Sequence, residues 1–180
     1  CILYINKITK MGGIRCSSDA LNKALEKIST ILNDSDINDW FISYGTLLGI
    51  IREDSCIDGD DDVDINISIS DRMQLYFLLM ANNFEIWIDR PDFIKTKPTE
   101  EIGSIDFYFC EMNQDVCNDT WNKIIWNSYK DKDNNFLKKE WNNIMLNIPF
   151  NPQDKLKAKY GNWEIPSNGN MGGESPYNLP

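Results

Sequence analysis

Histidine is absent from all 180 residues of this chain. Its absence excludes a Ser-His-Asp triad, a Cys-His pair and any metal site with histidine ligands. A metal bound by this chain must therefore be held by oxygen ligands, which favours Mg²⁺, Mn²⁺ or Ca²⁺.

Cysteine is scarce, with five residues and no CxxC pair. An odd number without paired spacing indicates neither a disulfide framework nor a zinc site. We interpret these residues as free, mostly buried thiols in a reducing compartment and predict a cytoplasmic location. The sequence begins with Cys1 rather than Met, so upstream residues can be missing and a secretory-pathway location stays open.

Positive charge and long apolar runs are also in short supply. Lys and Arg total 18 against 28 Asp and Glu, which gives a net charge of −10. Because an acidic surface repels a phosphate backbone, we expect no nucleic-acid partner. A small phosphorylated ligand stays compatible, because a bound divalent cation reverses the local sign. The longest apolar stretch, residues 40–51, is shorter than the roughly 18 residues that a membrane span needs, so no span is expected.

The hydrophobic patterns predict one α/β (α+β) domain over residues 1–180, with a mixed sheet flanked by helices. We expect helices at about 18–32, 46–51, 71–82, 121–129 and 152–160, and strands at 40–44, 63–69, 85–89, 92–97, 104–110 and 146–149. The helix at 71–82 is expected to bury Met73, Tyr76, Phe77 and Met80. Residues 167–180 are rich in Gly and Pro without periodicity, and we interpret them as a mobile tail.

Six aspartates lie between residues 54 and 64, directly before or within a predicted strand. An acidic run alone is typical of a solvated loop. Asp62 and Asp64, however, are two positions apart in a strand, so their side chains point to the same side. Two like charges about 7 Å apart repel each other, and a divalent cation between them would relieve that repulsion.

Asp106 is the one charged residue of the other strongly apolar predicted strand, at 104–110. A carboxylate in such a strand needs a partner, and a metal shared with the acidic run would supply one. A calcium hand beginning at Asp58 is not supported, because Val63 stands at its glycine position and Ile69 at its bidentate glutamate position.

Gly45 and Thr46 follow a predicted strand and open a predicted helix that ends near Arg52. Glycine lets the backbone approach a phosphate, and a helix N-terminus offers free N–H groups to it. Arg52 could add a charge-assisted hydrogen bond. Alone, this pattern is typical of a plain turn; next to the aspartates, it predicts a phosphate site.

The run YGTLLGIIREDSCIDGDDDVDINIS resembles the signature of the LicD, fukutin and fukutin-related family. That signature reads Gly-Thr-Leu-Leu-Gly, then Arg, then an acidic Asp-x-Asp-h-Asp block, where h is apolar. The matching residues are Gly45, Thr46, Leu48, Gly49, Arg52, Asp60, Asp62 and Asp64. The stretch SIDFYF resembles the later family strand, with Asp106 as third carboxylate. The stretch IPFNPQDKLKAKYGNWEIP resembles the C-terminal element of the family.

The resemblance implies a nucleotidyltransferase-like fold and a metal-dependent reaction. Its members transfer a phospho-alcohol, such as phosphocholine or phosphoribitol, from a CDP-linked donor to a sugar hydroxyl of a glycan. The expected partners are thus a CDP-linked small molecule and a glycan or sugar acceptor. The implied catalytic residues are Asp62, Asp64 and Asp106; the implied ligands of Mg²⁺ or Mn²⁺ are Asp60, Asp62, Asp64 and Asp106; the implied donor-phosphate residues are Gly45, Thr46 and Arg52.

Three departures from the family pattern bear on the substrate. Asp58-Gly59 stands where the family often has Pro-Trp, and Glu53 replaces the usual His. The stretch between Asp106 and Tyr160, which commonly shapes the acceptor site, is short. Two alternatives stay open: a nucleotidyltransferase acting on a small molecule, and a catalytically inactive binding module of the same fold.

Overall fold

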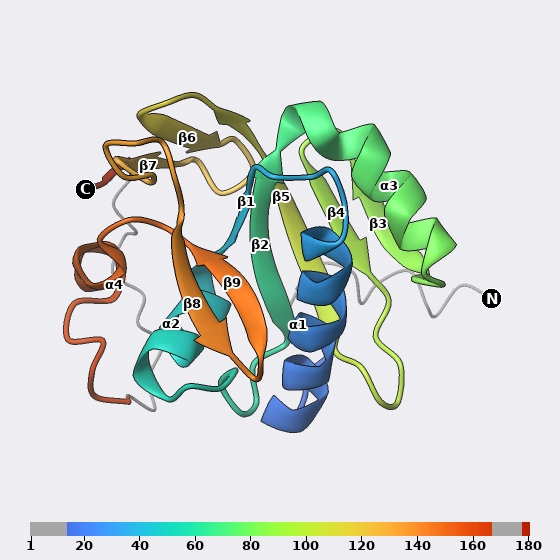
Figure 1. The fold of residues 1–180 in the computed structure, drawn as a ribbon. Coiled ribbons are helices and arrows are strands. Elements are labelled where there is room, and N and C mark those ends of the chain that lie inside the picture. The colour runs from blue at the N-terminus through green and yellow to red at the C-terminus, as the bar shows by residue number, and fades with distance from the viewer. Residues whose placement is uncertain (1–13, 167–177) are drawn as a thin grey trace, which may run out of the picture.

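A mixed sheet of eight strands forms the centre of the computed structural model, which describes residues 14–166 and 178–180 (Figure 1). Its main path runs β1-β2-β5-β6-β7-β10, and the β3-β4 hairpin joins through β4, which pairs antiparallel with β5. The strands are β1 Trp40–Ile42, β2 Asp62–Ser68, β3 Ile86–Arg90, β4 Phe93–Thr96, β5 Ser104–Met112, β6 Val116–Asp119, β7 Ile124–Asn127 and β10 Asn178–Leu179.

Helices and a separate hairpin pack around this sheet. The α-helices of the described residues are α1 Ser18–Asn33, α2 Tyr44–Arg52, α3 Arg72–Ala81 and α4 Pro152–Tyr160, with a 3-10 turn, η2 Ile69–Asp71, before α3. The hairpin of β8 Leu137–Trp141 and β9 Ile144–Ile148 packs on β1 and α1. The predicted α+β architecture with a mixed sheet flanked by helices is confirmed. Among the described residues, no helix combines the length and apolar character needed to cross a bilayer.

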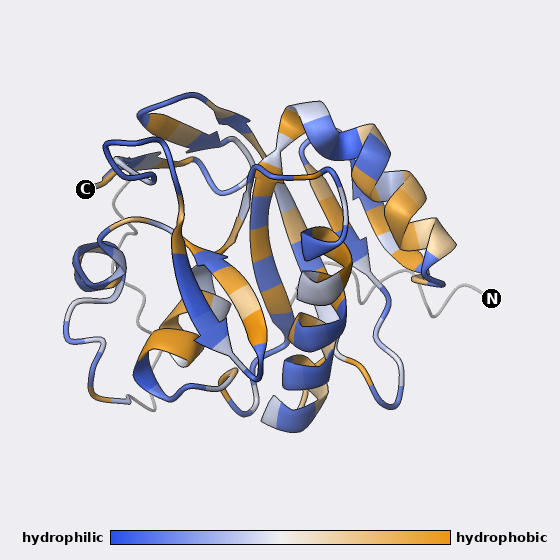
Figure 2. Ribbon diagram, viewed as in Figure 1, coloured by the Kyte–Doolittle hydropathy of each residue, from blue (hydrophilic) through white to orange (hydrophobic). Residues whose placement is uncertain are grey.

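The helix α1 fits the predicted bounds closely. Ser17 caps it by accepting a hydrogen bond from the backbone N–H of Ala20 at 3.3 Å, as an N-cap serine does. The helix packs across β2 and β5, and Figure 2 shows its apolar side turned toward the sheet. Its buried apolar side chains are Leu21, Ala24, Leu25, Ile28 and Leu32.

Parallel pairing of β2 with β5 forms the centre of the sheet, in a register that sets Asp64 opposite Asp106. Side chains alternate along both strands, so each strand carries one apolar and one polar face, visible as bands on β2 in Figure 2. Val63, Ile65 and Ile67 on β2 are fully buried in the core. The polar face carries the aspartates, so the fold itself brings the acidic run and Asp106 together.

The prediction of a helix at 121–129 is wrong, because this stretch forms a turn followed by β7. Burial alternates along β7, with Ile124 and Trp126 buried and their neighbours half-exposed. Lys123 and Ser128 at its ends have positive φ angles of 57° and 45°, which a continuous helix does not allow. The pairing of β7 with β6 therefore overrides the local helical pattern.

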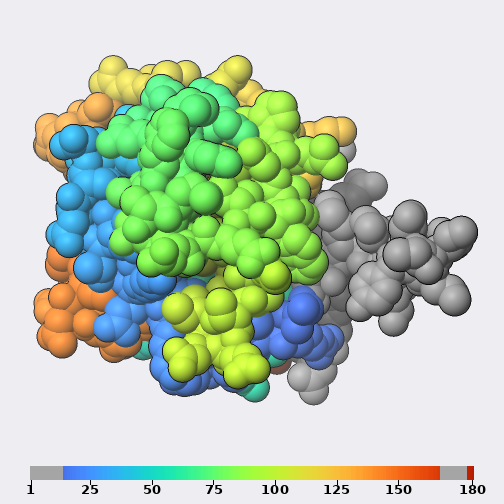
Figure 3. All heavy atoms as spheres, turned by 90° about the vertical axis from the view of Figure 1, so that its right-hand side faces the viewer, coloured from blue at the N-terminus to red at the C-terminus, as the bar shows by residue number. Residues whose placement is uncertain are grey.

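The helix α3 forms where predicted, but most of its predicted buried side is wrong, since only Tyr76 of the four predicted residues packs against the core, partly buried. Leu75 and Leu79 are its buried residues, whereas Met73, Phe77 and Met80 are more than half exposed. Figure 3 views the face of the molecule on which α3 lies. Because this helix is apolar nearly all round, the periodicity of its sequence cannot select the side that packs.

The predicted mobile tail lies mostly outside the described residues, since 167–177 fall there. Beyond them, Asn178 and Leu179 pair in parallel with β7 as β10. Leu179 is fully buried, and its carbonyl accepts a hydrogen bond from Asn127 Nδ2 at 2.9 Å. The last residues of the chain are thus an edge strand of the sheet.

Candidate active site

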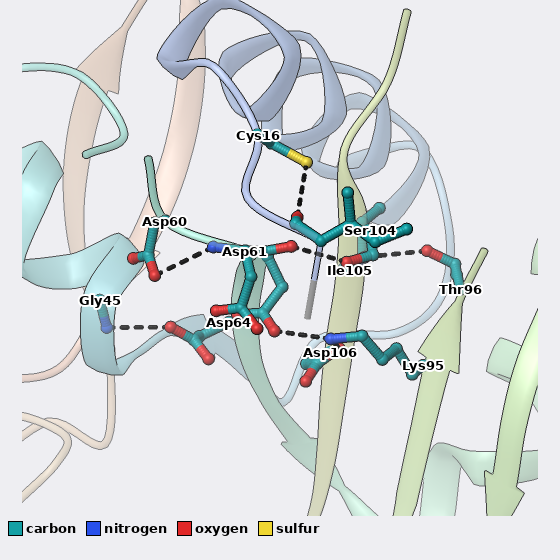
Figure 4. A network of polar contacts seen from close by, with 12 residues as sticks. Cys16, Gly45, Asp60, Asp61, Asp64, Lys95, Thr96, Ser104, Ile105 and Asp106 are labelled. Carbon is teal, nitrogen blue, oxygen red and sulfur yellow. Dashed lines mark hydrogen bonds and ion pairs between the residues drawn. The ribbon is translucent and has the colours of Figure 1, made fainter. Parts of the chain in front are cut away.

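The polar faces of β2 and β5 bring the predicted carboxylates together, as Figure 4 shows. Asp62 and Asp64 lie on β2 and Asp106 on β5, and both Asp64 and Asp106 are 6 % exposed. The predicted placement of these three residues on one face of one sheet is confirmed, whereas a cation shared by all three stays a prediction.

Lys95 is a site residue that the sequence analysis missed. It lies on β4 opposite Asp106, and its Nζ is 2.6 Å from Asp62 Oδ2 and 2.7 Å from Asp106 Oδ1. Burial alone would lower the pKa of Lys95, but Asp106 and Asp62 raise it above its ordinary value. A charged ammonium therefore lies between two of the predicted metal ligands. A lysine in the predicted strand at 92–97 was the available signal.

Asp64 caps the N-terminus of α2. Its Oδ2 accepts hydrogen bonds from the backbone N–H of Gly45 at 2.9 Å and of Thr46 at 3.4 Å. Its Oδ1 accepts one from the Tyr108 hydroxyl at 3.0 Å. Burial raises the pKa of Asp64 well above its usual range, and Asp62, among other carboxylates, adds to this effect. The hydrogen bonds and the helix dipole favour a carboxylate at this place.

The amides predicted to hold a phosphate thus have a carboxylate as their partner. The Thr46 hydroxyl is also engaged, because it accepts a hydrogen bond from the Asp64 backbone N–H at 2.8 Å. Gly45 packs closely on the acidic block: a Cβ at this position would lie 2.5 Å from Asp60 Oδ2 and 3.3 Å from Asp64 Oδ2, so a side chain at residue 45 would have to move the Asp60 carboxylate.

Arg52 lies at the C-terminal end of α2, opposite the end that begins near Gly45. Its guanidinium pairs with Glu53 at 2.5 Å and donates a hydrogen bond to the Trp163 carbonyl at 3.2 Å. In this structure, Arg52 joins α2 to the segment that follows α4. Its predicted contact with donor phosphates stays a prediction.

The departure Asp58-Gly59 has a structural role in this chain. Gly59 has a φ of +81°, which favours glycine, and its N–H donates to the Cys16 carbonyl at 3.0 Å. Asp58 Oδ1 accepts a hydrogen bond from the Ser18 N–H at 3.0 Å. The start of α1 therefore fixes the loop that leads to Asp60. Burial and Asp62 raise the pKa of Asp60 to about 6.

Asp119, on β6, is a buried carboxylate and the second residue near the site, after Lys95, that the sequence analysis missed. It accepts a hydrogen bond from the Tyr44 hydroxyl and two from Asn122, at 3.0 Å each. Tyr44 begins α2 with a φ of 44°, a rare backbone conformation for an aromatic residue. The hydrogen bond to Asp119 holds it there. No helix or strand was predicted around 111–120, so the sequence analysis could not predict that Asp119 lies near Tyr44.

The acidic face fits a divalent cation in its donor chemistry. In 14–166 and 178–180, no three acidic or cysteine side chains surround a common point as metal ligands. Asp62 and Asp106 nevertheless already share a cation, the Lys95 ammonium. Carboxylate oxygens are the ligands that Mg²⁺ and Mn²⁺ prefer. Burial and Asp62 raise the pKa of Asp106 to about 8, against the opposite effect of Lys95.

A solved structure with a similar fold is an adenylyltransferase. The lincosamide antibiotic adenylyltransferase LnuA, in its lincomycin-bound form, superposes with a TM-score of 0.52 at 14 % identity, over 73 % of this chain and 81 % of that one. The antibiotic-resistance factor ANT(2'')-Ia gives a TM-score of 0.49 at 10 % identity, over 71 % and 63 %. At 14 % identity the likeness to LnuA shows the fold alone. No curated protein matches the chain.

The sequence model of one family matches the chain directly. The LicD/FKTN/FKRP nucleotidyltransferase domain matches residues 38–159, about two thirds of the chain. This span contains Asp60, Asp62, Asp64 and Asp106, together with the N-terminus of α2. With the family match and the fold in agreement, the chain belongs to the LicD/FKTN/FKRP family.

Proposed function

We propose that this protein transfers a phospho-alcohol, phosphocholine- or phosphoribitol-like, from a CDP-linked donor to a sugar hydroxyl of a glycan. The family and the fold assign the chain to the nucleotidyltransferase-like transferases. The observation that carries the proposal is the convergence of Asp62, Asp64 and Asp106 on one buried face beside the N-terminus of α2.

Asp62 and Asp106 would hold Mg²⁺ or Mn²⁺, with Asp64 and Asp60 beside them. Such an ion, when bound, neutralises the charge of the donor diphosphate. Transfer of this kind depends on positioning and charge neutralisation more than on covalent catalysis, so a chain without histidine can perform it. Asp106 would either ligate this ion or accept the proton of the acceptor hydroxyl.

A second candidate is nucleotidyl transfer to a small molecule by the same carboxylates. The fold likeness to LnuA, which its title describes as a lincosamide antibiotic adenylyltransferase, favours this candidate. A third candidate is a binding module of the same fold without catalysis, which the short stretch between Asp106 and Tyr160 favours.

The leaving group separates the candidates. The protein is incubated with Mg²⁺, a sugar acceptor, and CDP-choline, CDP-ribitol, ATP or CTP in turn, and the products are identified by mass spectrometry. Phospho-alcohol transfer releases CMP from a CDP-linked donor, and we expect this result. Pyrophosphate released from ATP or CTP would show nucleotidyl transfer instead. Nucleotide binding without any product would show a binding module.

A further inference from the structure

Lys95 occupies the place at which Asp62 and Asp106 would share a metal ion. Its Nζ contacts both carboxylates at 2.6 and 2.7 Å, and the residue is only 7 % exposed. An ammonium and a divalent cation cannot both occupy this place, because they repel each other and compete for the same oxygens. Metal binding at Asp62 and Asp106 therefore has to release Lys95.

We propose that Lys95 competes with the divalent cation for Asp62 and Asp106 and, once released, binds a phosphate oxygen of the donor. This proposal rests on the proposed function, since it concerns the donor of the same site. Lysine suits both states, because its ammonium is a compact charge on a flexible stem with three donors. Lysine is also an established phosphate ligand in other proteins.

At the N-terminus of α2, phosphate-binding groups are likewise bound to a carboxylate. The backbone N–H groups of Gly45 and Thr46 are groups that bind phosphate at a helix N-terminus, and here they donate to Asp64. In the metal-free protein, the carboxylates thus bind both sets of phosphate-binding groups. A cation that draws the carboxylates to itself would free Lys95 and these amides together, so donor binding should depend on prior metal binding.

The test compares Lys95→Met with a matched lysine variant, Lys97→Met. Lys97 lies just after β4 and pairs with Glu85 at 2.8 Å on the surface, where its side chain is 52 % exposed. Mn²⁺ affinity is measured without nucleotide from the electron paramagnetic resonance signal of the free ion. CDP affinity is measured by calorimetry at saturating Mn²⁺. Lys95→Gln is the second variant, in case Lys95→Met does not fold.

We expect Lys95→Met to bind Mn²⁺ about tenfold more tightly than wild type, because the competing ammonium is gone. CDP at saturating Mn²⁺ should bind about tenfold more weakly, because one charged phosphate contact is lost. Lys97→Met should match wild type in both. Unchanged or weaker Mn²⁺ binding by the Lys95 variants would overturn the competition, and unchanged CDP binding would overturn the phosphate contact. Absence of Mn²⁺ binding by every variant would overturn both.

These readouts do not depend on turnover. If wild type releases no CMP from any CDP-linked donor while the Mn²⁺ and CDP effects are found, the proposed transfer fails and the role of Lys95 stands. If CMP is released while Mn²⁺ and CDP affinities are unchanged in Lys95→Met, the role of Lys95 fails and the proposed transfer stands.

Discussion

Among the residues that the structure describes, Lys95 and Lys155 are buried, in opposite electrostatic surroundings. Lys95 lies between two carboxylates, which raise its pKa. Lys155, on α4, is 1 % exposed, and its Nζ donates to the carbonyls of Ser128 and Pro180 at 3.4 and 2.5 Å. Burial lowers the pKa of Lys155 to about 8.

The difference separates a site residue from a structural one. A buried ammonium beside carboxylates is a charge that a ligand can displace, because the carboxylates also attract other cations. A buried amine that donates to carbonyls joins segments of the chain, here α4, the turn after β7 and the C-terminal residues. Lys95 and Lys155 are alike in residue type and burial, so only the groups that they contact distinguish the site residue from the structural one.

The largest expected effect comes from removing a partner of Lys95. Asp106→Asn should lower the proposed transfer about 1,000-fold, because an amide is a poor ligand for a hard cation and a poor base. Its melting temperature without metal should hold, because the buried carboxylate is neutralised rather than stranded. Turnover of a CDP-linked donor and thermal melting measure the two effects. Asp154→Asn, an exposed change beside Lys155, is the control and should keep wild-type turnover. Transfer by Asp106→Asn at the wild-type rate would remove Asp106 from the site.

Replacing each lysine should affect the transfer activity to different extents. Lys95→Met should lower kcat/KM for the CDP-linked donor about 100-fold, as loss of one charged phosphate contact does. Lys155→Met should stay within about twofold of wild type, because Lys155 donates to backbone carbonyls and lies outside the acidic face. Steady-state kinetics at saturating Mg²⁺ check both values. Equal losses in the two variants would contradict the division of roles.

The same two variants should also differ in unfolding free energy without metal, by less than they differ in activity. Lys95→Met leaves two carboxylates without their cation, which costs about 3 kcal/mol of unfolding free energy. Lys155→Met leaves two carbonyls without a donor, which costs about 1 kcal/mol. Urea unfolding in a metal chelator measures both. A larger loss in Lys155→Met would show that the carbonyl contacts, and not the ion pairs, dominate.

The stability of the folded protein should also depend on pH. The pKa values of Asp60 and Asp106 are raised in the folded protein, to about 6 and about 8. These groups stabilise the fold at low pH, and that contribution is lost as pH rises from about 4 to about 8. The pKa of Lys155 is lowered to about 8, so its contribution is present above about pH 10.5 and is lost as pH falls to about 8.

Melting curves at several pH values, in a metal chelator, test the two windows. Subtracting the curve of Asp106→Asn from that of wild type should isolate the acidic window, and subtracting that of Lys155→Met should isolate the alkaline one. A flat difference for Lys155→Met between pH 8 and 10.5 would show that Lys155 stays charged despite its burial.

Much of the candidate site could be predicted from local sequence. Asp62 and Asp64 share a face because strand side chains alternate, and Asp106 was identified by its apolar strand. The capping of α2 by Asp64 could not be predicted, because it depends on how closely β2 and α2 approach. Lys95 was missed for a similar reason: its place opposite Asp106 is set by the pairing of β4 with β5.

The sequence by itself determined the α+β class, the acidic face and the family signature, because these depend on periodicity and on residues near one another in the chain. Tertiary structure alone decided which face of α3 packs and which partner each buried lysine has. It also decided that Leu179 lies on an edge strand paired with β7. These outcomes depend on pairing between distant segments, and strand register is fixed only when the segments pack together. The short-range pattern therefore placed the carboxylates, and long-range packing supplied the cation between them.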